Sequence, residues 1–450
     1  MTDLAIIGGG PAGYTAAEKA AKAGLSVILL EKKALGGVCL NEGCIPTKTL
    51  LYSAKLYDQA RHSDKYGISS ENTSFDYATV LKRKTKVMRK LGGGIKIRMR
   101  DAGVTVVEGE ACITGKTGNV FTINCNSEIY EAANILICTG SSAFVPPVTG
   151  LERENVLTST EALELQEIPH SITIIGGGVI GMEFASLFNS FGSKVTVIEM
   201  LPHILGGLDT EVSDMLQGIY AKKGVEFHLG CKVSGINGKS VSYLTPEGES
   251  CSVEAESILV SVGRRANIAG LGLESIGVEC SRGITVDGHM RTNVPGVYAA
   301  GDVTGFSMLA HTASREAGIA VDNILGKDTS MNYNAIPGVV YTNPEVAGVG
   351  LTEAQAAAEG IAVKVAKLPM QYSGRFVAEN EAGEGVCKMI ADAGTGRLLG
   401  VHMLGNPCSE ILGSACLAIE NGLTAEGFSK TVFPHPSVTE ILKEVSGVLN

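Results

Sequence analysis

The sequence predicts an α/β protein with two similar parallel-sheet units and a separate C-terminal α+β domain. Three observations support this expectation. A pattern of strand, glycine-rich turn, helix and strand begins near residue 4 and recurs near residue 171. From about Met331 the pattern changes to strands that lack such a glycine turn. A chain of 450 residues also exceeds one hydrophobic core, so roughly two to four domains are expected.

The first unit starts with the apolar strand Leu4–Ile7, which runs into a turn containing Gly8, Gly10 and Gly13. An alanine-rich helix follows through about Ala23, and Leu25–Glu31 forms the second strand. The first glycine allows a tight turn, the second lets the backbone approach a pyrophosphate, and the third permits close helix–strand packing. Glu31, at the end of the second strand, is placed to accept hydrogen bonds from an adenosine ribose.

The second unit repeats this order with Ser171–Ile175, the glycines Gly176, Gly178 and Gly181, and the strand before Glu199. The third glycine and the acid are equally far apart in both copies. Two such fingerprints imply two dinucleotides in one chain. A carboxylate at Glu199 suits a free 2′-hydroxyl and repels a 2′-phosphate, so the second cofactor is expected to be NAD(H) and not NADP(H).

Two cysteines, Cys39 and Cys44, lie in the glycine-flanked segment Gly36–Lys48. Five residues of a regular helix rise about 7.5 Å, whereas a disulfide needs Cα atoms within about 6.8 Å. A bonded pair would therefore distort the helix start that Pro46 predicts near Cys44. Such a strained pair, with one thiol at a helix N-terminus, indicates a redox couple. A zinc half-site and two unrelated buried cysteines are the alternatives.

A basic helical stretch lies between the cysteines and the second fingerprint, at residues 82–100. Its default interpretation is a solvated helix face, and the alternative is a docking surface for an acidic partner. Strands are expected at residues 104–107, 120–123 and 134–138, and Pro146-Pro147 marks a domain exit.

A strand at residues 257–262 closes on Gly263, and a strand at residues 296–302 ends in Asp302. This aspartate either hydrogen-bonds a cofactor's hydroxyl groups or serves as a plain turn residue. A helix is expected to follow at residues 309–324.

The C-terminal region holds expected strands at residues 361–368, 385–391 and 398–404. Near its end His435 stands between two prolines, five residues before Glu440. A carboxylate partner can hold a histidine as a general base near pH 7. On local sequence alone, a structural loop histidine is an equal alternative.

Composition and charge argue against a membrane protein, a secreted protein and a general nucleic-acid-binding protein. The apolar runs are too short to cross a membrane, and the N-terminus lacks the features of a secretion signal. The formal net charge of −10 argues against general nucleic-acid binding. Most of the 11 cysteines are isolated, which is typical of reduced thiols in a reducing compartment, so a cytoplasmic location is expected.

The two fingerprints and the dithiol together imply a flavin. Nicotinamide exchanges hydride and reacts poorly with a disulfide, whereas a flavin reacts with both hydride donors and thiolates. The first unit should hold FAD and the second NAD. The chain resembles the pyridine nucleotide–disulfide oxidoreductases over essentially its whole length. The matching motifs are Gly36–Lys48, Gly176–Glu183 with Glu199, Gly301-Asp302 with Met308–His311, Tyr341–Ala347 and His435–Glu440.

This resemblance implies a role for each candidate residue. Cys39 would exchange with the substrate dithiol, and Cys44 would face the flavin. His435 would be the base, oriented by Glu440 and supplied by the other subunit of a homodimer. Lys48 and Glu183 match an ion pair beside the flavin. The resemblance places further cofactor contacts at Ala111, Thr139, Gly140, Ser141, Asp302, Ala310, Val233 and Gly263.

The implied reaction is oxidation of a protein-bound dihydrolipoyl group, with electrons passing through Cys39–Cys44 and FAD to NAD⁺. Its partner would be the lipoyl domain of a 2-oxoacid dehydrogenase or glycine-cleavage complex. The alternative is an NADH-dependent reductase of another small disulfide. The expected fold class is α/β, with two Rossmann-like dinucleotide-binding domains and a C-terminal α+β interface (dimerisation) domain.

The expected domains are FAD-binding (1–145 and 265–330), NAD-binding (146–264) and interface (331–450). One departure from the family pattern stands beside the base, where Phe433-Pro434 replaces the usual His-Ala.

Overall fold

The computed structural model describes residues 1–151 and 155–449. The chain forms two compact units, which are described separately. The first contains residues 1–49, 79–144 and 263–332, and the second contains residues 50–78, 145–262 and 333–450.

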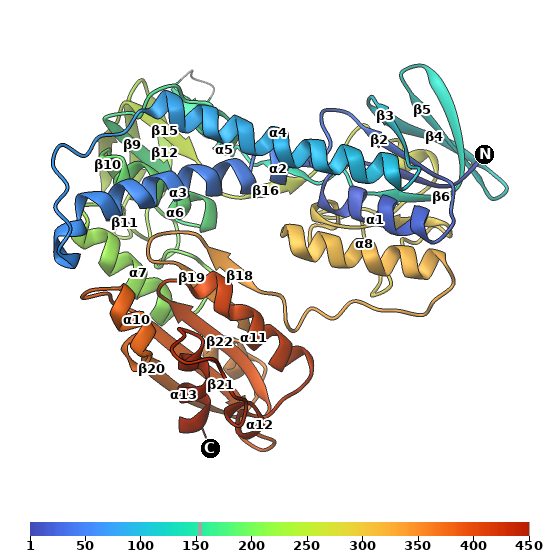
Figure 1. Ribbon diagram of the computed structural model, residues 1–450. Helices are drawn as coiled ribbons and strands as arrows, with labels where there is room; N and C mark the ends of the chain where they lie inside the picture. Colours follow the sequence, from blue (N-terminus) through green and yellow to red (C-terminus); the bar gives the residue numbers. More distant parts are fainter. Residues whose placement is uncertain (152–154, 450) are drawn as a thin grey trace. The chain divides into compact units, whose positions relative to one another are not determined.

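The first unit is built on a mainly parallel sheet with β1 at its centre. Leu4, Ala5 and Ile6 of β1 are fully buried, as expected for a strand covered on both faces. The helices α1 (Pro11–Lys22) and α8 (Ala310–Ile324) lie side by side (Figure 1), and Lys19 of α1 donates to Gly318 O and Asp322 of α8. The sheet runs in the order β3 (Thr105–Glu108), β2 (Val27–Glu31), β1 (Thr2–Ile7), β6 (Glu128–Ile137), β5 (Val120–Cys125) and β4 (Ala111–Thr117), with β17 (Val297–Ala299) also pairing with β6.

The first unit also contains all or part of three further helices. Cys39 lies on α2 (Gly37–Asn41), and Cys44 is the first residue of α3 (Cys44–Arg61), whose C-terminal part belongs to the second unit. The long basic helix α4 (Tyr77–Asp101) confirms the helical prediction for residues 82–100. The short strands β7 (Ser141–Ala143) and β16 (Arg264–Ala266) pair antiparallel.

The second unit contains the repeated fingerprint on a parallel sheet. That sheet runs in the order β11 (Glu226–His228), β10 (Lys194–Ile198), β9 (Ser171–Ile175), β15 (Ser257–Val260) and β8 (Val156–Leu157). Its helices are α5 (Ser159–Ala162), α6 (Val179–Ser190) and α7 (Thr210–Lys222). An antiparallel meander, which was not predicted from the sequence, consists of β12 (Lys232–Asn237), β13 (Ser240–Leu244) and β14 (Ser250–Glu254).

The C-terminal part of the second unit is an antiparallel sheet with helices packed on it, which confirms the expected α+β region. Its strands run in the order β18 (Gly338–Val340), β19 (Val346–Gly350), β22 (Leu398–Leu404), β21 (Val386–Asp392) and β20 (Val363–Pro369). Its helices are α9 (Glu353–Ala358), α10 (Gly374–Glu379), α11 (Cys408–Glu420), α12 (Ala425–Ser429) and α13 (Glu440–Val448). In the part of the chain that the structure describes, no helix is long and apolar enough to cross a membrane.

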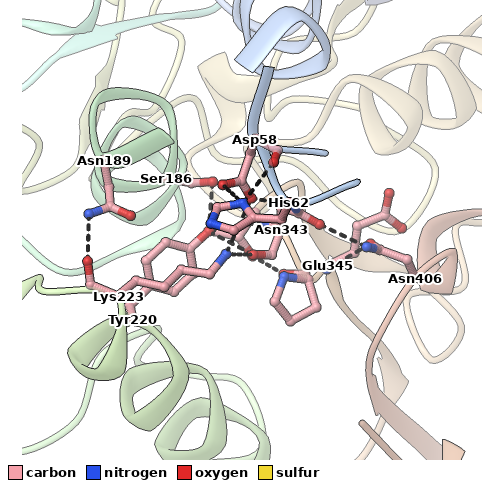
Figure 2. Close-up of polar contacts among 11 residues, drawn as sticks. Asp58, His62, Ser186, Asn189, Tyr220, Lys223, Asn343, Glu345 and Asn406 are labelled. Carbon is pink, nitrogen blue, oxygen red and sulfur yellow. Dashed lines mark hydrogen bonds and ion pairs between the residues drawn. The ribbon is translucent and has the colours of Figure 1, made fainter. Parts of the chain in front are cut away.

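A polar network in the second unit holds the loop that contains Asn343 and Glu345 (Figure 2). Tyr220, on α7, is 1% exposed, and its hydroxyl accepts a hydrogen bond from Asn343 N at 3.0 Å and lies 2.7 Å from Ser186 Oγ on α6. Lys223 donates to Asn343 O at 2.8 Å, and the Asn343 amide lies 3.4 Å from Asp58 on α3. The C-terminal part of α3 is therefore tied to the same loop as α6 and α7.

We predict that Tyr220→Phe lowers the free energy of unfolding by about 1–3 kcal/mol, because it leaves buried hydrogen-bonding groups without a partner. The matched control is Tyr66→Phe, since the Tyr66 hydroxyl also bonds two backbone groups, Glu379 O at 2.9 Å and Glu381 N at 3.0 Å, but the residue is 46% exposed. Water can replace those bonds, so this control should change stability by less than about 0.5 kcal/mol. Urea unfolding of both variants measures the difference, and equal losses would contradict the role of the buried network.

Candidate active site

The two glycine turns adopt nearly the same geometry. Gly8 and Gly176 have φ of +102° and +105°, a left-handed conformation that favours glycine. A Cβ added to Gly13 would lie 1.8 Å from Gly8 O, and one added to Gly181 would lie 1.9 Å from Gly176 O. The first and third glycines of each turn are thus required by the turn itself and by helix–strand packing.

The acids at the ends of the second strands are also equivalent. Glu31 Oε2 accepts a hydrogen bond from Gly9 N at 2.6 Å, and Glu199 Oε2 accepts one from Gly177 N at 2.6 Å. The other carboxylate oxygen accepts from Lys33 N in the first copy and from Leu201 N in the second, both at 2.7 Å. Each carboxylate is therefore fixed beside its glycine turn, with lone pairs left for a ribose.

Both helix N-termini fit a pyrophosphate. Gly10 and Gly178 are the N-caps of α1 and α6, neither helix has a side-chain cap, and neither has an acidic residue in its first turn. A Cβ on Gly178 would meet no atom within 4 Å, and one on Gly10 would meet only Gly37 Cα at 3.8 Å. Backbone N–H groups in an open position beside a positive helix end suit an anion. The residues present therefore fit two dinucleotides, FAD and NAD.

The redox segment is divided between two helices. The helix α2 ends after Asn41, and α3 begins at Cys44, as predicted from Pro46. Between them Glu42 N bonds Val38 O at 2.8 Å, and a Cβ on Gly43 would lie 3.1 Å from Val38 O. The break at Glu42-Gly43 removes the spacing problem of a single helix, because the helical geometry is interrupted between the cysteines. The sequence did not predict the short helix α2.

Both cysteines are present as thiols and close enough to hydrogen-bond. The hydrogen bond from Cys39 to Cys44 is the largest cause that raises the pKa of Cys39, followed by burial and by the negative charge of Cys44. Asp302 raises this pKa further, and Lys48 lowers it. The raised pKa of Cys39 favours its thiol form, and the position of Cys44 at the positive end of α3 favours a thiolate there.

The redox segment packs directly on the first glycine turn. Gly36 N donates to Gly9 O at 2.8 Å, and a Cβ on Gly37 would lie 2.7 Å from Gly10 Cα. Tyr14, which follows Gly13, was missed by the sequence analysis. Its pKa is raised by burial and then by the nearby Cys39, with Cys44 acting in the same direction. No local motif marks Tyr14, because only the folded turn brings it to the cysteines.

The remaining expected FAD contacts also lie in the first unit. Thr139 and Gly140 are held by Asn267, whose side chain donates to Thr139 O at 3.0 Å and whose backbone N donates to Gly140 O at 2.9 Å. Ser141 donates to Asp302 at 2.5 Å, so Asp302 sits at the carboxyl end of β17 beside the strand pair β7–β16. Ala111 begins β4, Ala310 begins α8, and Gly263 precedes β16 with φ of +128°.

The second unit holds Glu183, Val233, His435 and Glu440. Glu183 on α6 is 3% exposed and accepts a hydrogen bond from Tyr341 N at 3.1 Å, and Val233 lies on β12. His435 Nδ1 lies 2.9 Å from Glu440 Oε1, so Nδ1 carries the hydrogen and Nε2 of the neutral ring is the acceptor. The bonds from Ser437 N and then His435 lower the pKa of Glu440.

The His435 side chain is 80% exposed, so its ring is available at the surface of the single chain. Among the described residues, no group of three or more histidine, cysteine, aspartate or glutamate side chains is arranged to hold a metal ion.

Curated relatives match almost the whole chain. A protein named dihydrolipoyl dehydrogenase from Chlorobaculum tepidum is 41% identical over 99% of this chain and 96% of its own length. Another of that name from Bacillus subtilis is 39% identical over 99% of this chain and 96% of its own.

Solved structures match the whole chain as well. LpdA from Mycobacterium tuberculosis has a TM-score of 0.92 at 26% identity and covers 100% of both chains. A Cu(II) complex of RclA, an HOCl-induced flavoprotein disulfide reductase from Escherichia coli, has a TM-score of 0.88 at 30% identity and covers 100% of this chain and 99% of its own.

Two family models cover most of the sequence. The model described as pyridine nucleotide-disulphide oxidoreductase matches residues 2–317, and the model of that family's dimerisation domain matches residues 336–446. These matches confirm the resemblance and the fold class expected from the motifs. The chain belongs to the pyridine nucleotide-disulphide oxidoreductase family.

Proposed function

We propose that this chain is a dihydrolipoyl dehydrogenase, which oxidises protein-bound dihydrolipoyl groups to lipoyl groups and reduces NAD⁺ to NADH. One observation carries the proposal. A hydrogen-bonded Cys39–Cys44 pair lies against the glycine turn of one dinucleotide fold, in a chain with a second complete fingerprint. The dithiol substrate is supported by the names of relatives about 40% identical over nearly full length.

The cofactors follow the two glycine turns. Gly8, Gly10, Gly13 and Glu31 would hold FAD next to the cysteines, and Gly176, Gly178, Gly181 and Glu199 would hold NAD. When bound, FAD supplies a redox centre that reacts with a thiolate and exchanges hydride with nicotinamide. We further propose that Thr139, Gly140, Ser141 and Asp302 line the FAD site, with Ala111, Ala310, Val233 and Gly263 contributing to the two cofactor sites.

Thiol–disulfide exchange begins with Cys39 and Cys44 joined. One substrate thiolate attacks the Cys39 sulfur, forming a mixed disulfide and releasing Cys44 as a thiolate. The second substrate thiol, once deprotonated, attacks the substrate sulfur that is bonded to Cys39. This attack closes the lipoyl ring and releases Cys39. Two electrons and one proton remain on the cysteines. The geometry favours this division, because the Cys39 pKa is raised and Cys44 sits at a helix N-terminus.

The second proton goes to a base, for which we propose His435 of the other subunit of a homodimer. Glu440 fixes the Nδ1–H tautomer, so Nε2 is the atom that accepts the substrate's proton. Phe433, at the position of the family's usual histidine, packs against Phe428 at 5.6 Å between ring centroids. The Phe433-Pro434 departure therefore leaves the carboxylate partner of the base in place.

Other assignments rest on the family pattern. Lys48 and Glu183 would pair beside the flavin, where Lys48 already lowers the pKa of Cys39. We propose an FAD-binding domain of residues 1–145 and 265–330, an NAD-binding domain of 146–264 and an interface domain of 331–450. We also propose that the chain works in the cytoplasm with the lipoyl domain of a 2-oxoacid dehydrogenase or glycine-cleavage complex.

The second candidate is an NADH-dependent reductase of another small disulfide. The specific observation in its favour is the similarity to RclA, whose title describes a flavoprotein disulfide reductase. The same cysteine pair would then run the exchange in the opposite direction.

The function is tested by steady-state oxidation of dihydrolipoamide with NAD⁺. We expect the FAD-loaded protein to turn over, and Cys44→Ser to lose at least about a thousandfold in kcat while its flavin stays bound. Cys280→Ser is the matched control, because Cys280 is an exposed thiol elsewhere in the first unit and should not affect the rate. A wild-type protein inactive with dihydrolipoamide but fast in NADH-driven reduction of another disulfide would favour the second candidate.

The cofactor preference gives a separate prediction at Glu199. The wild-type protein should prefer NAD⁺ over NADP⁺, and Glu199→Gln combined with Met200→Arg should raise the NADP⁺/NAD⁺ ratio of kcat/KM by at least about tenfold. The charge that repels a 2′-phosphate is removed, and an arginine is placed at a position that is 65% exposed. Glu254→Gln, on the exposed surface of the same unit, should leave the ratio unchanged. An unaltered ratio in the double variant would refute the assignment of Glu199.

A further inference from the structure

The helix α4 has an unusual charge for this chain. It carries nine lysines and arginines and one acidic residue, Asp101, although the formal net charge of the whole protein is −10. Eight of the nine cations are exposed, and five of these eight define the basic face: Lys82, Lys86, Arg89, Lys90 and Lys96. The cysteine chemistry described above uses none of them.

The basic face lies opposite the packed side of α4. Ile95 and Met99 are buried in the core of the first unit, and 3.6 residues per turn place Lys86 and Lys90 on the other side. Lys82 and Arg89 lie beside these two, and Lys96 lies at the edge of the basic face. Within the described residues, none of the five has an acidic side chain at ion-pair distance, whereas Arg98 pairs with Glu18 and Arg100 with Asp101.

Repulsion between the like charges of the basic face destabilises α4. The pairs Lys82–Lys86 and Lys86–Lys90 are like charges at i,i+4, which destabilise a helix by about 0.2–0.5 kcal/mol each. A helix face selected only for solubility needs no such run of one sign, since acidic residues interleaved with the lysines would serve better. The charge pattern therefore favours a partner over simple solvation.

The packed side of α4 touches the redox segment. Leu40, next to Cys39, shares the core with Ile95 and Met99, and a Cβ on Gly92 would lie 3.7 Å from its side chain. Arg83 donates to Thr49 O of α3 at 3.0 Å. The Arg98 guanidinium lies 5.5 Å from the ring of Tyr14, whose pKa both redox cysteines raise. A partner bound to the basic face is thus separated from the redox segment by about one helix diameter, roughly 10–12 Å.

We propose that the basic face of α4 docks an acidic carrier domain that presents its dihydrolipoyl arm to Cys39. This inference rests on the proposed function and adds the chemistry by which the macromolecular substrate is recognised. A carrier must leave after each turnover, and complementary charge raises its association rate without a large apolar interface. Free dihydrolipoamide is uncharged at its amide, so the basic face should not raise its association rate.

The test compares two substrates on one triple variant, Lys86→Gln/Arg89→Gln/Lys90→Gln. One substrate is free dihydrolipoamide, and the other is a reduced, lipoylated domain of acidic net charge. We expect kcat/KM for the domain to fall by about tenfold at low ionic strength, while kcat/KM for dihydrolipoamide stays unchanged. Added salt should lower the wild-type rate with the domain and reduce the difference between wild type and variant.

Two matched controls accompany the variant. Lys232→Gln/Lys239→Gln/Lys364→Gln removes three exposed lysines elsewhere in the chain and should leave both rates unchanged. Amidation of the carrier domain's carboxylates should slow its reaction with wild type and abolish the effect of the triple variant. Glutamine is a good helix former, and circular dichroism checks that α4 is intact.

The outcomes separate the docking proposal from the proposed function. A wild-type protein inactive with free dihydrolipoamide would refute the function. A protein active with dihydrolipoamide whose rate with the acidic domain is the same in wild type and the triple variant would refute docking on α4. Equal losses with both substrates would also refute it, because they would indicate damage to the redox site. An effect seen only in the affinity of the chain for itself or for DNA would assign the face to another occupant.

Discussion

The hydrogen bond between Cys39 and Cys44 is the interaction on which the other features of the site depend. It depends on the interruption between α2 and α3, which releases the two cysteines from the spacing of one continuous helix. A continuous helix would hold them too far apart. The break in turn requires Gly43, since a side chain there would press on Val38 O. One local change in the backbone thus brings the two sulfurs within hydrogen-bonding distance.

The first glycine turn gives this pair its place in the fold. Gly37 lies so close to Gly10 that a Cβ at position 37 would be 2.7 Å from Gly10 Cα, and Gly36 N donates a hydrogen bond to Gly9 O. The loop that fits a pyrophosphate is also the surface on which the redox segment rests. The second fingerprint repeats the turn, the packing and the carboxylate bond without a cysteine segment. The asymmetry between two otherwise equivalent turns explains why one is assigned to FAD and the other to NAD.

The sequence predicted those features that depend on neighbours in the chain. Both glycine turns, the strands beside them and the helix start at Cys44 follow from local patterns of apolar residues, glycine and proline, and the structure has them. The pairing of His435 with Glu440 is likewise local. The meander β12–β14 was missed, although Val241 and Tyr243 of β13 alternate with serines and are buried in one core. The positions of Tyr14, Asn267 and Tyr220 depend on contacts far along the chain, which no local pattern records.

The central claim is that Cys39 and Cys44 form a redox centre distinct from the flavin. Anaerobic titration of the FAD-loaded protein with dithionite tests it most directly. A disulfide and a flavin each accept two electrons, so the wild-type protein should take up about four electron equivalents per subunit and Cys39→Ser about two. Uptake of about two electrons by both proteins would contradict the account, because the cysteines would then have no part in electron transfer.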